Sequence, residues 1–435
     1  MLEDETVYPL AASAEAMGMQ ACLNCRPYRL AQTVARSGQE LVRRAVRLIV
    51  AGALDQGTEA DLATRLGLSV RHLRRMFVTH LGVTPDSVAR SCRAHFARRL
   101  LDDTEISITE IAFMAGFGSV RQFNRDCRSI FRATPSQLRA GYSDPGRLAA
   151  DGGLTVRLWF TGPLEWDALV SFLAMRAVPG VECVYGRTYR RTIVVDGHPG
   201  VLELGPGGSD HLQLRVHLPY WAGLVHLTAQ ARRIASLDED VMEPVRWLTA
   251  DPVIGSSLAA RPGVRVPGAW DPFEAGVAAI VGQGLPGEES REFLAKLVGR
   301  FGNPVPGLGR FRLTHAFPTP GALTAAGTGL QAIGLARGRA ETLLSFSSAV
   351  ERGTLRLDGS MRCDQLISSI TAIPGMTASA AHYIALRMSE PDVFPADDPV
   401  LQRALDHLAG KPSPEISHRW RPWRSYAAAH LWAVR

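Results

Sequence analysis

The hydrophobic positions in residues 61–77 have the spacing of two short helices separated by a turn. Leu62, Ala63 and Leu66 fall on one helical face. Gly67 interrupts this pattern, and the polar residues after it can cap a second helix. The segment therefore predicts a helix-turn-helix unit.

A second segment, residues 107–131, repeats the same pattern. Its matching positions are Ile111, Ala112 and Gly116, each 49 residues after its counterpart (111 − 62, 112 − 63, 116 − 67). One glycine turn between amphipathic helices is a weak signal, because any helical hairpin can show it. Two copies favour an all-α DNA-binding domain built from a pair of helix-turn-helix units.

Both units leave basic or amide side chains on the outer face of their second helix. Arginine can bond guanine bidentately, asparagine and glutamine can do the same with adenine, and further arginines neutralise phosphates. The alternative is a solvated basic face without function. The candidate DNA-binding residues are Arg71, His72, Arg74, Arg75, Arg121, Gln122, Asn124 and Arg125.

The pattern changes after a glycine-containing linker at residues 143–153. Short alternating segments then predict strands of an antiparallel sheet, with one helical segment at residues 166–178 among them. From residue 270 onward the pattern is almost wholly helical. The expected strands are residues 154–160, 191–197 and 212–218. The sequence thus predicts an α+β domain followed by an all-α domain.

Composition and charge narrow the picture only slightly. The chain has 435 residues, is 46% hydrophobic and 21% charged, and has room for about two to four globular domains. No apolar run reaches the roughly 18 residues that a membrane helix needs. The first residues are acidic where a secretory signal is basic, which predicts a cytoplasmic protein with no membrane partner. The net charge of +6 mildly favours an anionic partner.

Two segments in the helical half hold candidate chemistry. Residues 370–388 predict a helix, a Pro-Gly turn and a second helix, which is either a phosphate-binding hairpin or a plain helical hairpin. Asp397 and Asp398 precede Pro399 at an expected helix start. Aspartate is a preferred N-cap and proline fits the first helical turn, so the local pattern favours a structural role.

The first third resembles the AraC/XylS-type DNA-binding domain over residues 40–140. The most specific stretch is ITEIAFMAGFGSVRQFNRDCRSIFRATPSQLR. One departure is Cys127, where that family usually carries a buried aromatic residue. A small thiol there is expected to loosen the local packing without touching the DNA-binding face.

Residues 155–435 resemble AlkA-like 3-methyladenine DNA glycosylases of the helix-hairpin-helix superfamily. The resemblance rests on PLEWDALVSFLAMRAVPGVE, RPGVRVPGAWDPFEAGVAAIVGQ, IPGMTASAAHYIALR, FPADD and WRPWRSYAAAHLW. With the first third, the chain resembles a bacterial Ada–AlkA fusion. The implied domains are residues 36–142 (AraC-type), 154–265 (α+β) and 266–435 (helix-hairpin-helix).

Residues 1–30 resemble the last part of an Ada-type zinc domain. Cys22 and Cys25 have the spacing of half a zinc site, and the other two ligands would lie before residue 1. The remaining cysteines offer no matching pair. We therefore expect neither bound zinc nor methyl transfer, and no other cofactor.

The glycosylase resemblance assigns roles to residues by position. It makes Asp398 the catalytic carboxylate, gives Asp397 only a structural role, and makes Gln283 a DNA-binding residue that precedes the wedge. It implies a base pocket of Phe172, Tyr383 and Trp432, with Trp166 behind, and a hairpin with Gly375 and Thr377 on the DNA.

Three departures from the family pattern affect this site. Gly284 stands at the position of the residue that wedges into the DNA, so Leu285 would have to serve. Thr377 replaces a hairpin glycine, and threonine does not tolerate a positive φ. Ser379 replaces a pocket tryptophan and stands where lyase-type relatives carry a Schiff-base lysine, which implies a monofunctional enzyme.

The leading hypothesis is a monofunctional glycosylase that excises alkylated purines, tethered to a sequence-specific DNA-binding module. The expected partners are double-stranded DNA, alkylated bases and RNA polymerase, for a monomer associated with the nucleoid. The alternative is a regulator of the alkylation response whose glycosylase half is inactive. An enzyme unrelated to DNA has support only from the acidic pair.

Overall fold

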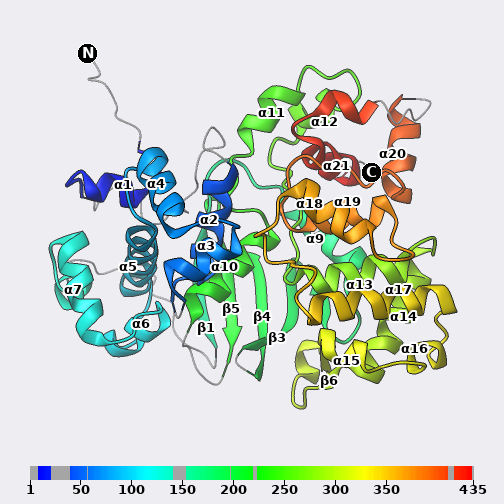
Figure 1. The fold of residues 1–435 in the computed structure, drawn as a ribbon, viewed down its shortest axis with the longest axis horizontal. Coiled ribbons are helices and arrows are strands. Elements are labelled where there is room, and N and C mark those ends of the chain that lie inside the picture. Colours follow the sequence, from blue (N-terminus) through cyan, green and yellow to red (C-terminus); the bar gives the residue numbers. More distant parts are fainter. Residues whose placement is uncertain are drawn as a thin grey trace. The chain divides into compact units, whose positions relative to one another are not determined.

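A computed structural model describes residues 8–20, 40–55, 57–140, 153–195, 197–218, 223–409 and 416–433 (Figure 1). The chain forms two compact units. The first comprises Met1–Phe160, Pro219–Gln230 and Asp358–Ser360, and the second comprises Thr161–Leu218, Ala231–Leu357 and Met361–Arg435. No helix of the described residues is both long and apolar enough to span a bilayer.

The first unit is mainly helical and is organised around α5. Helix α5 contacts α1, α2, α6, α7 and α8. Leu62, Leu73 and Phe77 belong to a core that is closed to solvent. The elements are α1 (Ala11–Ala16), α2 (Glu40–Val50), α3 (Glu59–Arg65), α4 (Val70–Leu81), α5 (Pro85–Asp103), α6 (Ile108–Met114), α7 (Val120–Phe131), α8 (Pro135–Ala140) and β1 (Leu154–Trp159).

The two predicted helix-turn-helix units are confirmed as α3–α4 and α6–α7. Gly67 and Gly116 adopt φ values of +70° and +81°, a backbone conformation in which glycine carries no steric penalty. Ser69 caps α4 by accepting from the backbone N–H of His72, and Ser119 caps α7 in the same way. Because these interactions are local, the two helix-turn-helix units could be predicted from the sequence.

The second unit contains four consecutive antiparallel strands in the order β5-β4-β3-β2. In the β3–β4 register Arg190 lies opposite Glu203, and the two side chains form an ion pair at 2.7 Å. The sequence predicted β3 and β5 to within a few residues but missed β2 and β4. The strands are β2 (Glu182–Tyr185), β3 (Thr188–Val195), β4 (His198–Pro206) and β5 (His211–His217).

The rest of this unit is almost wholly helical, as expected from residue 270 onward. Helix α10 (Leu224–Ile234) runs across the division between the units. The other elements are α9 (Trp166–Arg176), α11 (Met242–Leu248), α12 (Gly255–Ala260), α13 (Pro272–Gly282), α14 (Gly287–Phe301), β6 (Asn303–Pro304), η2 (Gly309–Phe311), β7 (His315–Ala316), α15 (Pro320–Thr324), α16 (Gly329–Ala332), α17 (Arg337–Glu351), α18 (Cys363–Thr371), α19 (Ala378–Arg387), α20 (Pro399–Ala409), η3 (Ile416–Trp420) and α21 (Arg424–Ala433).

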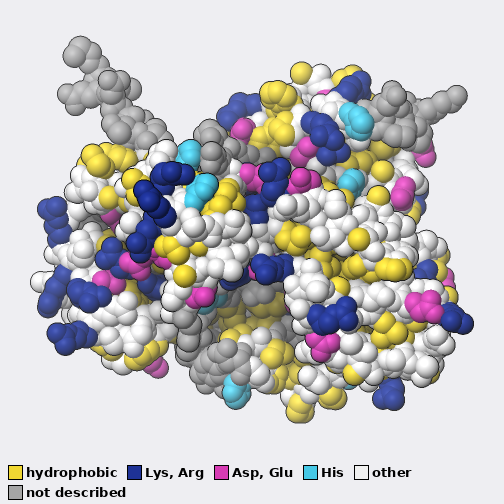
Figure 2. All heavy atoms as spheres, viewed as in Figure 1, with side chains coloured by type: hydrophobic (Ala, Val, Ile, Leu, Met, Phe, Trp, Pro, Cys, Tyr) yellow, Lys and Arg dark blue, Asp and Glu magenta, His cyan; other side chains and the backbone are white. Residues whose placement is uncertain are grey.

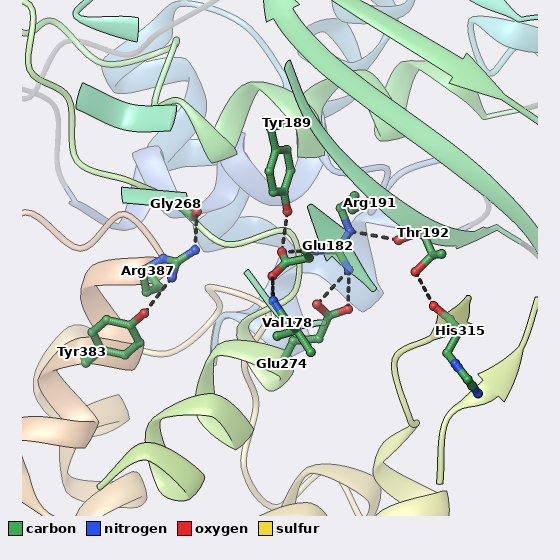
Figure 3. Close-up of polar contacts among 10 residues, drawn as sticks. All are labelled: Val178, Glu182, Tyr189, Arg191, Thr192, Gly268, Glu274, His315, Tyr383 and Arg387. Atoms are coloured by element: carbon green, nitrogen blue, oxygen red, sulfur yellow. Dashed lines mark hydrogen bonds and ion pairs between the residues drawn. The ribbon is translucent and has the colours of Figure 1, made fainter. Parts of the chain in front are cut away.

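A buried ion-pair network joins the sheet to α13 (Figure 3). Arg191 of β3 donates from Nη2 to both carboxylate oxygens of Glu274 at 2.8 Å. Its Nη1 lies 3.3 Å from Oε1 of Glu182, which also accepts from the hydroxyl of Tyr189. The Arg191 side chain is only 2% exposed. These charge-assisted bonds hold the N-terminal turn of α13 against the sheet.

Candidate active site

Asp398 is the N-cap of α20. Its Oδ1 accepts hydrogen bonds from the backbone N–H groups of Val400 at 2.9 Å and Leu401 at 3.1 Å. Pro399 follows as the first helical residue, where the missing N–H costs nothing. The helix-cap role that the local sequence predicted is therefore confirmed for Asp398.

Asp398 also makes contacts that a helix cap does not need. The indole Nε1 of Trp432 on α21 donates to Oδ1 at 3.1 Å. The guanidinium Nη2 of Arg176, at the end of α9, lies 3.4 Å from Oδ2. The Asp398 side chain is 16% exposed. Its neighbour Asp397 is exposed, and its backbone N–H donates to Ser379 Oγ at 3.0 Å. The two carboxylates thus have different environments.

Three of the predicted pocket aromatics lie together beside Asp398. The ring centroids of Phe172 and Trp432 are 4.9 Å apart, and those of Tyr383 and Trp432 are 6.3 Å apart in an edge-on arrangement. Phe172 and Trp432 are buried, whereas Tyr383 is half-buried. Helices α9, α19 and α21 each contribute one ring, so an aromatic cluster adjoins the carboxylate.

Trp166 has a structural contact instead. It is buried in the first turn of α9, and its Nε1 donates to the backbone carbonyl of Arg187 at 2.8 Å. This bond fastens the start of α9 to the turn between β2 and β3. The role of Trp166 behind the base pocket stays a prediction.

Two arginines that the sequence analysis did not identify cover the aromatic faces. The Cζ of Arg176 lies 4.1 Å from the ring centroid of Phe172 and 5.1 Å from that of Trp432. The Cζ of Arg387 lies 5.3 Å from Phe172 and 5.7 Å from Tyr383. Each arginine follows a pocket aromatic by four residues on the same helix (176 − 172, 387 − 383). Such i, i+4 pairs share a helix face, so this spacing was the signal available in the sequence.

Arg387 is anchored at both ends of its guanidinium, as Figure 3 shows. Its Nη1 donates to the hydroxyl of Tyr383 at 2.8 Å, and its Nη2 donates to the backbone carbonyl of Gly268 at 2.9 Å. Gly268 precedes α13. These two bonds fix the Tyr383 hydroxyl and link α19 to the start of α13.

The hairpin between α18 and α19 has its left-handed residue at Gly375, with a φ of +84°. A Cβ at this position would lie 2.0 Å from Thr342 Oγ1, so only glycine fits. Thr377 has an ordinary extended backbone with a φ of −86°, and its side chain caps α19 by accepting from the Ala380 N–H. The expectation that Thr377 would need a positive φ is therefore wrong.

The loop after α13 carries the residues predicted to enter the DNA. Gln283 caps the helix end, and its carbonyl accepts from Arg339 Nη2 at 2.5 Å. Gly284 is exposed with a φ of +70°, and Leu285 is half-buried. A Cβ at position 284 would meet nothing within 4 Å, but the positive φ would strain any residue other than glycine.

The outer faces of α4 and α7 differ in how much of their predicted set is free to meet DNA. Figure 2 shows basic side chains gathered over α4 and α7. The exposed residues are Arg71, His72, Arg74, Arg75, Arg121 and Arg125. Arg74 is held by Glu59 at 2.5 Å, and Arg125 lies 3.3 Å from Asp126.

The two amides predicted to read bases are not fully outward. Gln122 and Asn124 are half-buried. The Oε1 of Gln122 accepts from the Gly118 N–H at 3.2 Å, and the Nδ2 of Asn124 donates to the Val120 carbonyl at 2.9 Å. Each amide has one group bound to the local backbone, so a bidentate contact with adenine requires that this bond be exchanged.

Cys22 and Cys25 lie outside the described residues. Within the described part of the chain, no group of three or more metal-ligating side chains could hold an ion. Cys127 is buried, and burial raises the pKa of its thiol to about 12, which makes it an inert packing residue.

Comparison with known proteins matches both halves of the chain. The helix-turn-helix domain family matches residues 62–141, and the AlkA N-terminal domain family matches residues 155–271. A probable bifunctional transcriptional activator/DNA repair enzyme AlkA of Mycobacterium tuberculosis is 34% identical over 435 residues, covering 98% of this chain and 87% of the relative. DNA-3-methyladenine glycosylase 2 of Escherichia coli is 32% identical over 272 residues, 62% of this chain and 94% of the relative.

Solved structures show the same fold for the second half. A 3-methyladenine DNA-glycosylase from Archaeoglobus fulgidus superposes with a TM-score of 0.55 at 22% identity, covering 63% of this chain and 96% of that one. The fold and the similarity to these relatives define a glycosylase-type unit joined to a helix-turn-helix unit. The chain belongs to the AlkA family of bifunctional transcriptional activators and DNA repair enzymes.

Proposed function

We propose that this protein excises alkylated purines from double-stranded DNA by base flipping and hydrolysis of the N-glycosidic bond. The observation that carries the proposal is the Asp398 carboxylate, fixed beside Phe172, Tyr383 and Trp432. Alkylation at a ring nitrogen makes the purine cationic, so an aromatic site attracts it through the π-faces. The names of the relatives, which include a 3-methyladenine glycosylase, support this substrate class.

The geometry gives the two oxygens of Asp398 different tasks. Oδ1 accepts from two backbone N–H groups and the Trp432 indole, which fixes its position. Oδ2 faces Arg176 and is the oxygen left for chemistry. Cleavage of the glycosidic bond develops positive charge on the sugar, and a fixed carboxylate lowers that barrier electrostatically. The leaving base is already cationic, so no strong general acid is required.

The hairpin and the loop after α13 would hold the DNA around the flipped nucleotide. Gly375 and Thr377 precede α19, where backbone N–H groups can bind a phosphate. Leu285 would fill the gap that the flipped base leaves, and Gln283 before it would contact the DNA. Flipping costs a few kcal/mol, and least for a damaged pair. Ser379 in place of a lysine supports a monofunctional enzyme that does not nick the strand.

The first unit would act as a sequence-specific DNA-binding module that regulates transcription. Its exposed arginines on α4 and α7 support phosphate and base contacts. RNA polymerase is the proposed further partner of a monomer associated with the nucleoid. The proposed boundaries remain residues 36–142 for this module, 154–265 for the α+β domain and 266–435 for the glycosylase domain.

The decisive experiment measures base release from DNA treated with a methylating agent. Asp398→Asn should abolish release while leaving duplex binding intact, whereas Asp397→Asn should retain release because Asp397 is exposed and its carboxylate plays no part in the chemistry. Absence of release by the folded, DNA-bound wild type would favour the alternative, a transcriptional regulator with an inactive glycosylase domain. Binding with a steep salt dependence would accompany that outcome.

A further inference from the structure

Arg176 places its positive charge at the two positions that the proposed reaction would give to other positive charges, those of the alkylated base and of the sugar. Its guanidinium lies 4.1 Å from the Phe172 centroid and 5.1 Å from the Trp432 centroid, and 3.4 Å from Asp398 Oδ2. In the proposed reaction a cationic base would stack on these rings, and a cationic sugar would approach this oxygen. One side chain therefore stands at both positions.

A flipped base cannot avoid this guanidinium by entering between the rings. Phe172 and Trp432 are in direct contact, with centroids 4.9 Å apart, which leaves no space for a third ring between them. Any base that contacts these two rings must therefore approach them from outside the pair, where the Arg176 guanidinium already lies over both rings. A side chain of the protein thus already stacks on two of the three aromatic rings of the site.

The two arginines of the site differ in how firmly they are held. Arg387 donates to the Tyr383 hydroxyl and to the Gly268 carbonyl. Arg176 has a long ion pair with Asp398 and remains 20% exposed at the last residue of α9. A long side chain at a helix end, with one ion pair and stacking contacts, can swing outward at low cost.

We propose that Arg176 is a displaceable internal cation that closes the base pocket of the DNA-free protein and leaves when a flipped base enters. It keeps the half-buried Asp398 charge paired until the substrate arrives. This inference rests on the proposed role of Asp398 as the carboxylate that meets the sugar. Arg176 then determines how strongly the pocket binds a base, because a base must displace it to stack on Phe172 or Trp432.

The displacement cost is the same for charged and neutral bases. Replacing Arg176 by alanine should therefore strengthen the binding of both kinds by the same factor. We expect about tenfold, the order of magnitude of a desolvated cation–π contact. If the guanidinium instead stayed in the pocket, its charge would repel a cationic base selectively, and only the cation would gain from the substitution.

The test uses the full-length protein and calorimetric titration with two probes, the cation 3,9-dimethyladeninium and the neutral 9-methyladenine. Arg176→Ala and Arg176→Gln should each bind both probes more tightly, with an unchanged ratio between them. The matched control is Arg246→Ala on α11, which removes one exposed positive charge outside the site and should bind like wild type.

Three results would overturn the proposal: unchanged affinities in both Arg176 variants, tighter binding of the cation alone, or weaker binding of both probes. Thermal unfolding of each variant separates these results from loss of the fold. The titration needs no turnover, so it is independent of base release. If Asp398→Asn retains release, the proposed function fails even where the Arg176 variants behave as expected.

Discussion

The indole Nε1 of Trp432 donates a hydrogen bond to Oδ1 of Asp398 at 3.1 Å. One side chain therefore serves the site in two ways, because its ring packs on Phe172 while its N–H orients the carboxylate. The hydrogen bond therefore couples the position of the Trp432 ring to that of the Asp398 carboxylate. Any base that stacks on this ring is placed at a fixed position relative to the carboxylate.

Trp432→Phe separates these two contributions. Phenylalanine keeps an aromatic ring but removes the N–H donor, and a hydrogen bond to a charged group is worth roughly 1.5–3 kcal/mol. We expect the rate of base release to fall at least about tenfold, with much less change in probe binding. Single-turnover release from methylated DNA, together with probe titration, measures both quantities. Trp247→Phe, at an exposed position on α11, is the control, and an equal loss in both variants would contradict the assignment.

The hairpin should be sensitive to a change at position 375 and tolerant of a change at position 377. Gly375→Ala forces a Cβ to within 2.0 Å of Thr342 Oγ1 and strains a φ of +84°, so it should distort the turn and weaken duplex binding. Thr377→Gly should cost only a few tenths of a kcal/mol, because glycine is tolerated at an N-cap. Duplex affinity and thermal unfolding measure the contrast. Tighter duplex binding by Thr377→Gly would restore the view that threonine impairs this hairpin.

Breaking the Arg191–Glu274 pair should strongly destabilise the second unit. Burial disfavours the charged form of Arg191, but the Glu274 carboxylate raises its pKa above the ordinary value, so the guanidinium stays charged. Glu274→Gln leaves that charge without its main partner, which should cost about 3–5 kcal/mol in the free energy of unfolding. Urea denaturation measures this loss.

The control for this pair is Glu243→Gln, at an exposed position on α11. The double variant Arg191→Met with Glu274→Leu should regain much of the lost stability, since replacing both buried charges avoids the uncompensated one. A double variant no more stable than Glu274→Gln would show that the pair acts through shape and not through charge.

His430 should make the protein sensitive to acid. The residue is fully buried on α21, and burial, assisted by the charge of Arg261, lowers its pKa from 6.5 to about 4. Between these values the unfolded chain binds a proton that the folded chain excludes, so stability falls as the pH drops from about 6.5 to about 4. The full shift corresponds to about 3 kcal/mol.

His430→Leu removes this contribution. Urea denaturation at pH 7.5 and pH 5.0 should therefore show a smaller loss of stability in the variant than in the parent. His407→Leu, at an exposed position on α20, should lose stability as the parent does. Parallel losses in all three proteins would assign the acid sensitivity to other groups.

The parts of the fold that depend on local interactions were predictable from the sequence. Gly67 and Gly116 mark the two turns because each adopts a positive φ, and the helices after residue 270 show a clear period. Strand β4 was missed because Pro199, Gly200 and Gly205 interrupt its alternation. A strand of this kind is recognisable only from its hydrogen bonds to β3 and β5.

The site was only partly predictable for the same reason. The cap role of Asp398 follows from its neighbours in sequence, whereas its contacts with Trp432 and Arg176 depend on the folded arrangement of three helices. Phe172, Tyr383 and Trp432 came from family resemblance alone. Arg176 was overlooked, although its spacing from Phe172 on one helix was visible.

The distance between Arg176 and Asp398 along the chain has a consequence for the order of folding. The two residues are separated by 222 positions, whereas each helix-turn-helix unit is assembled from neighbouring segments. Contacts between distant segments form late, since the loop between them must close first. A newly made chain therefore gains its DNA-binding helices before its cleavage site. Under mild denaturation the site around Asp398 should be lost first, so that base release stops while the protein still binds duplex DNA.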